Sequence, residues 1–407
     1  MPGSKDMSVE TVEEGIETGV SKPILSSGLA VTDIPISAPT RTITVGINLV
    51  RFGDPHIGGN LVYAREMVSR IIASGTPTKL FCWDVDTCCE LFGEEVRPLC
   101  VPVPGKRAML AMHFGLKKAC RQAGVDVLFS PSHLFPMLAP ACPVVCTIHD
   151  LNFKHFSQGK KKDLYKSVMY KWMVAKATRL ITISEFTRQD VYASFPKALG
   201  KTDMIHNGVT TFAEVTEEAP DQPYILAIGH HPHKRPEFAI EILGEVYQIR
   251  PQSNLRLKIC GLPKARIEEL QDVVADAGLE GKVDLFPYVP DSQLAELYQH
   301  AIALVFPSTF EGFGLPVLEA MSHGTPVIAL NSTSLPEVMG DAGILLDDTE
   351  AIRWAVEVLH LQSDRERWQE LWTRGKIQAA LFSWDRCASR VLTTLRTAVE
   401  SRSPQPR

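Results

Sequence analysis

The residue pattern with the most chemical content is a pair of glutamates around two glycines. Glu311 and Glu319 are separated by seven residues, and Gly312 and Gly314 lie between them. Glycines in such a turn allow the backbone to approach a ligand closely. Pro316 suits the first turn of a helix, where its missing N–H would have no partner. The first carboxylate thus belongs to a loop and the second to a helix, so the two could contact opposite ends of one elongated ligand.

The start of this helix favours an anion. We expect Leu315 at its N-cap, and leucine has no side-chain oxygen to accept from the free N–H groups of the first turn. A helix N-terminus also carries a partial positive charge, so a bound phosphate would satisfy these groups. The competing interpretation is a tight glycine-rich turn with two solvent-exposed glutamates, and the spacing alone leaves both open.

A pair of cations precedes a second helical segment. Lys234 and Arg235 follow the apolar run 224–229, and two fixed cations at a strand end could neutralise a leaving diphosphate. Taken in isolation, this segment is better explained as a solvated basic turn.

The elements that must position these residues alternate along the chain. From Thr42, short β-rich runs such as TITVGINLV, KLFCW, DVLFS, PVVCTI, RLITIS and TDMIH alternate with helix-period segments. After an acidic, polar stretch near 210–222, the alternation resumes with YILAIG, LRLKIC, KVDLFPYV, ALVFP, PVIAL and GILLD. Beyond Asp348 the spacing is helical to Leu395, broken only at 382–383. This pattern predicts an α/β protein with two doubly wound parallel sheets and a deep cleft between two domains, where ligands bind beyond the carboxyl ends of the strands.

Composition narrows the class of protein. A chain of 407 residues exceeds the size at which single cores stop growing, about 250 residues. Apolar residues make up 45% and charged residues 22%, as in soluble globular proteins, and a net charge of −5 argues against a nucleic-acid partner. No apolar run is long enough to span a bilayer and no signal peptide is evident, so we expect a cytoplasmic protein.

The full string F-E-G-F-G-L-P-x-L-E-A-M-x-x-G-T-P-V, which begins at Phe310, resembles the donor-sugar signature of glycosyltransferase family 4. Members are retaining enzymes of the two-domain GT-B fold that use nucleotide-diphosphate sugars. The resemblance extends from about Thr42 to Leu395 and is strongest after Tyr224. It implies two Rossmann-like domains, 41–215 for the acceptor and 222–382 for the donor. A disordered tail at 1–40 and, at 383–407, a C-terminal helix that could pack on the N-terminal domain complete the expected organisation.

The resemblance also assigns roles to individual residues. Glu311 would contact hydroxyls of the donor sugar, Glu319 would bind the ribose, and the backbone at 312–315 (Gly312, Phe313, Gly314 and Leu315) would meet the diphosphate and the sugar. Lys234 matches the lysine of a phosphate-binding Arg–Lys pair. The arginine position is occupied by His230 or His231, which leaves Arg235 as a substitute.

In the N-terminal half, the resemblance places Gly58 and Gly59 near the donor phosphates, although a lone Gly-Gly turn is a weak signal. His149 follows a buried strand and would approach the donor sugar, frequently through its backbone carbonyl. A histidine in this position is more often structural than catalytic. Asp150 would orient the imidazole or the acceptor, and Ser184 is interpreted as a helix N-cap rather than a nucleophile.

No metal or other cofactor is expected. The Asp84-Val85-Asp86 triplet would hold a metal in a different transferase fold, but here it is interpreted as a polar strand end. The nine cysteines show no paired C-x2-C spacing, which fits reduced, mostly buried thiols. Cys88-Cys89 could bind a soft metal or form a redox switch, but local packing is the favoured interpretation.

Positive charge is concentrated in the segment Lys154–Arg179, which has eight basic residues and one acid. Leu164, Val168, Trp172 and Ala175 recur at helical spacing and are expected to pack inward. The lysines, with Tyr165 and Tyr170, could then lie on an anionic bilayer, at the inner face of the cytoplasmic membrane. A solvated helix face is the alternative.

Together these observations predict a retaining glycosyltransferase. It would move a hexose or deoxyhexose, with mannose one candidate, to a glycan or lipid-linked acceptor in cell-surface polysaccharide assembly. Three alternatives remain. A nucleotide-sugar epimerase would share the architecture, a silent glycan-binding homologue would need no intact Glu311, Glu319 and Lys234, and a dinucleotide-binding oxidoreductase is weakened by the missing G-x-G-x-x-G after the first strand.

Overall fold

The computed structural model describes residues 42–52, 59–157, 159–210, 223–229 and 231–401, which belong to one compact unit. Four features predicted from the sequence lie outside the described residues. They are the tail at 1–40, Gly58, His230 and most of the polar stretch between the two sets of strands.

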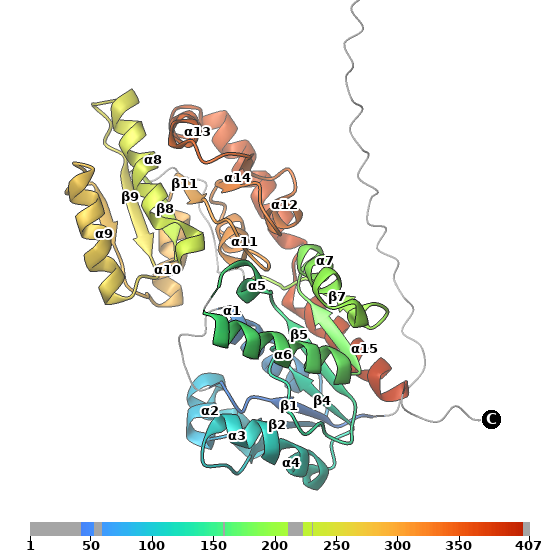
Figure 1. Cartoon of the computed structure of the whole chain (residues 1–407). Helices are drawn as coiled ribbons and strands as arrows, with labels where there is room; N and C mark the ends of the chain where they lie inside the picture. The colour runs from blue at the N-terminus through green and yellow to red at the C-terminus, as the bar shows by residue number, and fades with distance from the viewer. Residues whose placement is uncertain (1–41, 53–58, 158, 211–222, 230, 402–407) are drawn as a thin grey trace, which may run out of the picture. The chain divides into compact units, whose positions relative to one another are not determined.

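The first sheet, in the blue-to-green half of the chain in Figure 1, is parallel, with the strand order β3-β2-β1-β4-β5-β6-β7. Its strands are Val45–Asn48 (β1), Thr78–Cys82 (β2), Cys100–Pro102 (β3), Val127–Ser130 (β4), Val144–Ile148 (β5), Arg179–Thr182 (β6) and Thr202–Met204 (β7). Strands β1, β4 and β5 are buried along their whole length, because helices cover both faces of the sheet.

The helices of this half are Gly59–Ala73 (α1), Val85–Phe92 (α2), Ala108–Leu110 (α3), Leu116–Ala123 (α4), Asn152–His155 (α5), Lys160–Lys176 (α6) and Glu185–Ser194 (α7). Shorter turns are 3₁₀ helices at Glu94–Leu99 and Pro196–Ala198 and a π-helix at Ala111–Gly115. The predicted N-cap at Ser184 is confirmed, since its side chain accepts from the Thr187 N–H at the start of α7.

The second sheet is also parallel, with the order β10-β9-β8-β11-β12-β13. Its strands are Tyr224–Ile228 (β8), Arg256–Cys260 (β9), Val283–Leu285 (β10), Ala303–Phe306 (β11), Val327–Leu330 (β12) and Ile344–Leu346 (β13). Its helices are Pro236–Ile249 (α8), Lys264–Asp276 (α9), Asp291–Gln299 (α10), Leu315–Ser322 (α11) and Leu335–Met339 (α12), with a 3₁₀ turn at Pro232–Lys234. The prediction of two doubly wound, Rossmann-like sheets is confirmed.

Three helices close the chain: Ala351–Ser363 (α13), Arg365–Ala380 (α14) and Trp384–Glu400 (α15). The expectation of a single break at 382–383 was wrong. A second break occurs at Asp364, because its carboxylate accepts from the Arg367 N–H and thereby caps the start of α14.

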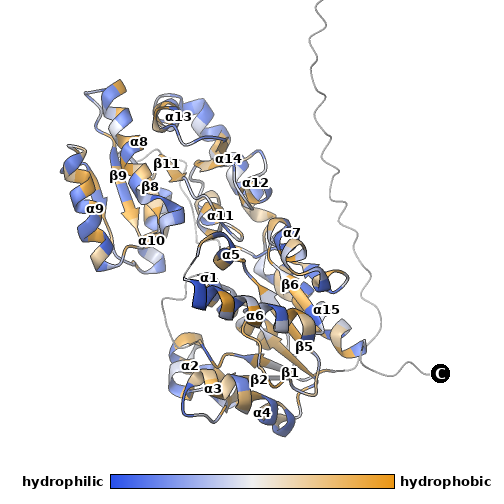
Figure 2. Ribbon diagram, in the orientation of Figure 1, coloured by the Kyte–Doolittle hydropathy of each residue, from blue (hydrophilic) through white to orange (hydrophobic). Residues whose placement is uncertain are grey.

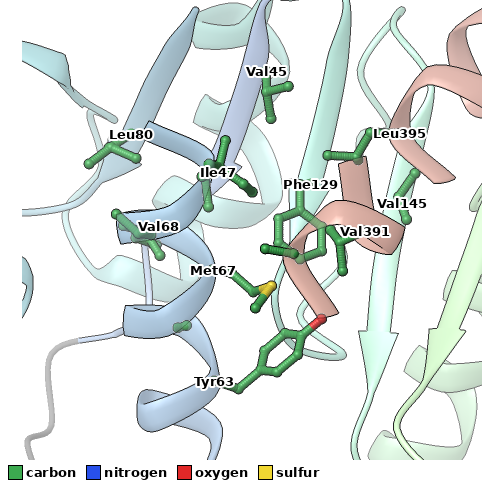
Figure 3. Packing of buried hydrophobic residues seen from close by; sticks show 14 of the residues in the cluster. Val45, Ile47, Tyr63, Met67, Val68, Leu80, Phe129, Val145, Val391 and Leu395 are labelled. Carbon is green, nitrogen blue, oxygen red and sulfur yellow. The ribbon is translucent and has the colours of Figure 1, made fainter. Parts of the chain in front are cut away.

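Helix α15 lies on the first sheet, far from its neighbours in sequence. Figure 3 shows Val391 and Leu395 of α15 packed with Met67 of α1 and Phe129 of β4. Trp384 belongs to the same buried cluster. The C-terminal helix is therefore part of the core of the N-terminal half. No helix in the described part of the chain is long and apolar enough to cross a membrane.

Candidate functional site

The loop between β11 and α11 holds the glycine-rich turn. Gly314, not Leu315, is the N-cap of α11, so the predicted cap position was wrong by one residue. Gly314 has φ 99°, in the left-handed region that side-chain-bearing residues rarely adopt, and Leu315 is the first residue of the helix. Pro316 lies in the first turn as predicted, and no side-chain hydrogen bond caps this N-terminus. The start of α11 therefore keeps the anion-binding character expected of it.

Glu311 is held in place by four neighbours. Its Oε1 lies 3.2 Å from Nζ of Lys234 and accepts a 2.8 Å hydrogen bond from Ser308 Oγ. The Glu311 backbone N–H donates to Thr333 Oγ1, and its carbonyl accepts from Ser334 Oγ. The Lys234 and Glu311 side chains are only 15% and 13% exposed. This carboxylate is thus fixed before any ligand arrives.

The structure brings one of the two predicted cations to Glu311. Lys234 lies there, with its Nζ also 5.0 Å from the centre of the Phe306 ring. Arg235 instead adopts φ 52° at the N-cap of α8, and its guanidinium carbon lies 4.4 Å from the centre of the Phe238 ring. His231 is exposed and stacks with His233. The role of Arg235 at a phosphate stays a prediction.

Glu319 lies in α11, about one helical turn after Leu315, the first residue of the helix. Its Oε2 accepts a 3.0 Å hydrogen bond from the hydroxyl of Tyr298 in α10. Burial raises the pKa of Glu319 above its usual value, although the Tyr298 hydrogen bond and the charge of Lys234 oppose the shift. Glu319 therefore pays a desolvation cost that a hydrogen-bonding ligand would offset.

A cavity of about 210 Å³ opens beside Glu319. Its walls come from both halves of the chain: Val62, Arg65 and Glu66 of α1, residues 208–210, Asp291, Leu294, Ala295 and Tyr298 of α10, Leu315, Glu319 and His323 at α11, and Trp384 of α15. The cavity thus gives Glu319 access to a ligand in the cleft that the sequence predicts.

The N-termini of α1 and α11 approach each other. Gly59 is the first residue of α1, and a Cβ placed on it would lie 3.3 Å from Cδ1 of Leu315, the first residue of α11. The first residues of the two helices therefore lie close together, and each helix N-terminus carries a partial positive charge.

Gly312 is required by packing between the two halves of the chain. A Cβ at this position would lie 2.1 Å from the carbonyl oxygen of His149. The Gly312 carbonyl accepts hydrogen bonds of 2.6 Å from Ser184 Oγ and 3.1 Å from Thr187 Oγ1. The glycine-rich loop is therefore joined directly to the loops that follow β5 and β6.

The imidazole of His149 has a structural partner. Its Nε2 lies 2.8 Å from the carbonyl oxygen of Pro131, and its ring makes an edge contact with Tyr63. Burial lowers the pKa of His149, against the opposing effects of the Pro131 hydrogen bond and of Asp150, so the ring is neutral and Nε2–H donates to Pro131. What His149 presents to Gly312 is its carbonyl. Asp150 Oδ1 accepts from the N–H of Asn152.

The sequence did not predict the role of Glu337, whose carboxylate links the loop after β6 to α12. Both carboxylate oxygens of Glu337 accept from the Glu185 N–H, at 2.8 and 2.9 Å, and Oε1 lies 2.6 Å from His206 Nε2. Burial alone would raise the pKa of Glu337, but these hydrogen bonds and the charge of His206 hold it below the usual value. The partners of Glu337 lie more than a hundred residues away in the sequence, so no local spacing could reveal this role.

The acidic triplet has local roles. Asp84 caps α2 by accepting from the Thr87 N–H, and Asp86 pairs with Arg97. The triplet therefore begins a helix instead of ending a strand, and its carboxylates are engaged by neighbours in sequence.

The expected orientation of α6 was wrong. The four residues predicted to pack inward are exposed: Leu164 (66%), Val168 (55%), Trp172 (37%) and Ala175. The buried residues of α6 are Tyr170, Met173 and Val174. Tyr170, predicted to face a bilayer, points inward because its ring stacks on Phe195 and its hydroxyl donates to the Asp150 carbonyl. Tyr165 is 47% exposed, as predicted.

Comparison with known proteins identifies the family of the chain. The family described as "Glycosyl transferases group 1" matches residues 209–376, and "Glycosyltransferase Family 4" matches residues 57–211. O-antigen chain mannosyltransferase B of Escherichia coli is 32% identical over 265 residues, which cover 61% of this chain and 68% of that protein.

Solved structures share the fold. Sucrose-phosphate synthase from Thermosynechococcus elongatus superposes with a TM-score of 0.70 at 19% identity, covering 88% of this chain and 100% of that one. HepE of Anabaena, solved in complex with UDP and glucose, gives a TM-score of 0.66 at 18% identity and covers 87% of this chain and 99% of that one. The same family is indicated by the two family descriptions, by the Escherichia coli relative and by the GT-B fold. The chain belongs to glycosyltransferase family 4, the group 1 glycosyl transferases.

Proposed function

We propose that this glycosyltransferase moves a hexose or deoxyhexose, with mannose the first candidate, from a nucleotide-diphosphate sugar to a glycan or lipid-linked acceptor in cell-surface polysaccharide assembly. The observation that carries the proposal is the fixed pair of Glu311 and Lys234, 3.2 Å apart, beside the converging N-termini of α1 and α11. Mannose is suggested by the name of the Escherichia coli relative, which is a mannosyltransferase.

The proposed donor lies along α11. Glu319 would accept from the ribose hydroxyls, the helix N-termini and Lys234 would hold the diphosphate, and Glu311 would contact sugar hydroxyls. The cation at Lys234 and the two helix dipoles supply positive charge where a metal would otherwise be needed, so transfer is proposed to proceed without one.

The proposed reaction breaks the bond between the anomeric carbon and the diphosphate oxygen. The acceptor hydroxyl attacks the anomeric carbon from the face that the diphosphate leaves, which retains configuration, and the leaving diphosphate takes the hydroxyl proton. In this proposal the His149 imidazole has a structural role, in which its Nε2–H donates to the Pro131 carbonyl. The His149 carbonyl is proposed to orient the sugar, and Asp150 the acceptor.

The donor is tested by thermal unfolding against UDP-, GDP-, ADP- and dTDP-sugars. A ligand that binds the native state raises the melting temperature, so one nucleotide should stand out. Glu319→Ala should weaken its binding by about 1.5–3 kcal/mol, the worth of hydrogen bonds to a charged acceptor. Glu296→Ala removes an exposed glutamate of α10 as a matched control. Equal affinity in the two variants would remove the ribose role.

Release of the nucleoside diphosphate tests the reaction class. A transferase releases it in quantity only when an acceptor is added. An epimerase interconverts two nucleotide sugars with no acceptor, and that result would replace the transferase proposal.

We also propose that α6 rests on an anionic membrane. Its outward face carries Leu164, Val168 and Trp172, which are spaced by four residues and so form one stripe. Lys160–Lys162 at the start of the helix are exposed, and Figure 2 colours this end of α6 as hydrophilic. Apolar side chains at the centre of an exposed face with cations at its margins are typical of helices that lie in a membrane interface.

Neighbouring segments extend the apolar surface. Exposed apolar residues also occur at Met109, Leu110, Phe114, Met137 and Leu138. They are tied to α6 by the Tyr165 hydroxyl, 4.0 Å from Met109 Sδ, and by the Trp172 Nε1–H, which donates to the Pro136 carbonyl. Exposed apolar residues gathered near a basic helix are what a membrane-binding surface requires.

Co-sedimentation with vesicles of anionic lipid tests the contact. Replacing Lys160, Lys161 and Lys162 by Gln should reduce binding, at about 1 kcal/mol per lysine, and binding should fall with salt. Replacing Arg250, Lys264 and Arg386, three exposed cations on other elements, is the charge-matched control. If both triple variants bind vesicles equally well, α6 is an ordinary solvated helix.

A further inference from the structure

Three cysteine thiols meet at the edge of the first sheet, at a place that glycosyl transfer does not use. Cys82 ends β2, Cys88 lies in α2 and Cys100 begins β3. Their sulfur atoms lie within 4.8 Å of one another, and the sulfurs of Cys88 and Cys100 are 3.8 Å apart. In the part of the chain that the structure describes, no other group of three His, Cys, Asp or Glu side chains converges this closely.

The fold explains how these distant cysteines come together. In the parallel pairing of β2 with β3, Cys100 stands opposite Leu80, and Cys82 follows Leu80 by two residues. Side chains two residues apart on a strand point to the same face, so Cys82 and Cys100 share one face of the sheet. Helix α2 contributes Cys88 to the same buried cluster. The spacing along the sequence therefore lacks the C-x2-C pattern, although the thiols are neighbours in space.

The donor set selects the kind of ligand. The three groups are sulfur donors, which favour thiophilic metal ions such as Zn²⁺ and Cu⁺ over hard cations. In a tetrahedral zinc site with Zn–S bonds of about 2.3 Å, neighbouring sulfurs lie about 3.8 Å apart, and the Cys88–Cys100 separation is 3.8 Å. Cys82 and Cys88 are each 2% exposed, whereas Cys100 is half-buried and gives an ion a route of entry.

We propose that Cys82, Cys88 and Cys100 bind a thiophilic metal ion, Zn²⁺ or Cu⁺, as thiolates. Each thiol loses its proton to solvent as its sulfur takes a place on the metal. A fourth position is open to water or to Cys89, which follows Cys88 in α2 and is also buried. The bound ion would tie the edge strand β3 and helix α2 to β2. The role is structural, and it stands whether or not the proposed donor is correct.

The test uses the full-length protein, freed of metal under reducing conditions and titrated with Cd²⁺ as a probe for Zn²⁺. One equivalent should bind and produce the near-ultraviolet absorption of cadmium thiolates. Cys100→Ser should lose at least about tenfold in affinity. Cys142→Ser is the matched control, because Cys142 is also half-buried and also has a cysteine neighbour, Cys120. A second experiment measures the affinity for Cu⁺ by competition with a Cu⁺ chelator.

Two results would support the proposal and two would overturn it. Binding of Cd²⁺ displaced by Zn²⁺ identifies a zinc site, and binding confined to Cu⁺ identifies a copper site at the same thiols. Equal affinity in wild type and Cys100→Ser, or no binding by wild type, would leave the cysteines as core residues only. If Cys100→Ser does not fold, the proposal is tested by counting the reactive thiols of the wild-type protein alone. Added metal must then protect three thiols from a thiol reagent, and a chelator must expose them again.

Discussion

At the scale of single residues, the glycine-rich loop is shaped by packing as much as by its ligand. The sequence predicts Gly312 as a place where the backbone approaches a phosphate. The structure gives a second reason, because the His149 carbonyl occupies the space that a side chain would need. Sequence alone could not reveal this, since the contact joins loops more than 150 residues apart.

Gly312→Ala should therefore destabilise the protein and disturb the site. A methyl group 2.1 Å from a backbone oxygen forces the two loops apart, which we expect to cost about 1–3 kcal/mol in free energy of unfolding. Gly244→Ala is the control, because Gly244 lies inside α8 with open space around it. That variant should gain up to about 1 kcal/mol. Thermal or urea unfolding of both variants checks the prediction, which fails if Gly312→Ala is as stable as wild type.

Glu319→Gln should make the protein more stable while weakening nucleotide binding. Burial raises the pKa of Glu319, so the folded state disfavours its carboxylate. Between the ordinary pKa of a glutamate, about 4.3, and the raised pKa of Glu319, the folded state binds more protons than the unfolded state. The free energy of unfolding therefore falls as pH rises between these two values. The neutral amide removes that cost. We expect a higher melting temperature than wild type at pH 7 and no difference below about pH 4, where the carboxyl is protonated in both states. A lower melting temperature at pH 7 would contradict the assignment.

The residues of the site differ in how well the sequence predicts them. Glu311, Glu319 and the turn between them follow from one continuous string. The pairing of Glu311 with Lys234 and of Glu319 with Tyr298 does not, because each pair joins different strands or helices and depends on the order of strands in the sheet. The roles of these residues in binding a donor stay predictions.

At the scale of elements, α6 shows where apolar periodicity misleads. The spacing of Leu164, Val168 and Trp172 identifies an apolar stripe correctly. It does not say what covers the stripe, and in this structure Tyr170, Met173 and Val174 on another face supply the core contact. The outward stripe is what a membrane-binding helix requires, so the corrected orientation strengthens the membrane proposal.

The double substitution Leu164→Ser with Val168→Ser should leave stability within about 0.5 kcal/mol of wild type, because both side chains are exposed. Binding to anionic vesicles should fall by an order of magnitude or more, since two apolar side chains no longer enter the bilayer. Ile377→Ser with Leu381→Ser is the control. These residues of the C-terminal half are 64% and 53% exposed, close to the 66% and 55% of Leu164 and Val168. Equal loss of vesicle binding in both double variants would refute a specific role for α6.

At the scale of the whole molecule, contacts between residues distant in sequence hold the two sheets in one unit. Ser184 donates to the Gly312 carbonyl, Glu337 accepts from the N-terminus of α7 and pairs with His206, and α15 returns to the core of the first sheet. The sequence predicts both sheets because buried parallel strands read as apolar runs. It does not predict these contacts, because each depends on residues distant in sequence.

Glu337→Gln should lower stability by about 1–3 kcal/mol at neutral pH, because charge-assisted hydrogen bonds to the Glu185 N–H and His206 are weakened. The pKa of Glu337 is depressed, so its contribution is present above the ordinary pKa and is lost as pH falls through the folded value. The difference from wild type should therefore be present near neutral pH and shrink as pH falls below about 5. Glu268→Gln, an exposed change in α9, should have no effect at any pH. A difference independent of pH would exclude the charge of Glu337 as its cause.

The central claim is that the loop after β11 grips a donor sugar, and Glu311→Gln tests it most directly. The amide keeps the size of the side chain and removes the charge that faces Lys234. If Glu311 contacts the sugar where positive charge develops in the transition state, kcat for sugar transfer should fall on the order of 10²-fold, with affinity for the free nucleoside diphosphate nearly unchanged. Donor turnover with acceptor present, beside calorimetry of the diphosphate, gives both values. Unchanged turnover, or a fall in diphosphate affinity as steep as the fall in kcat, would contradict the account.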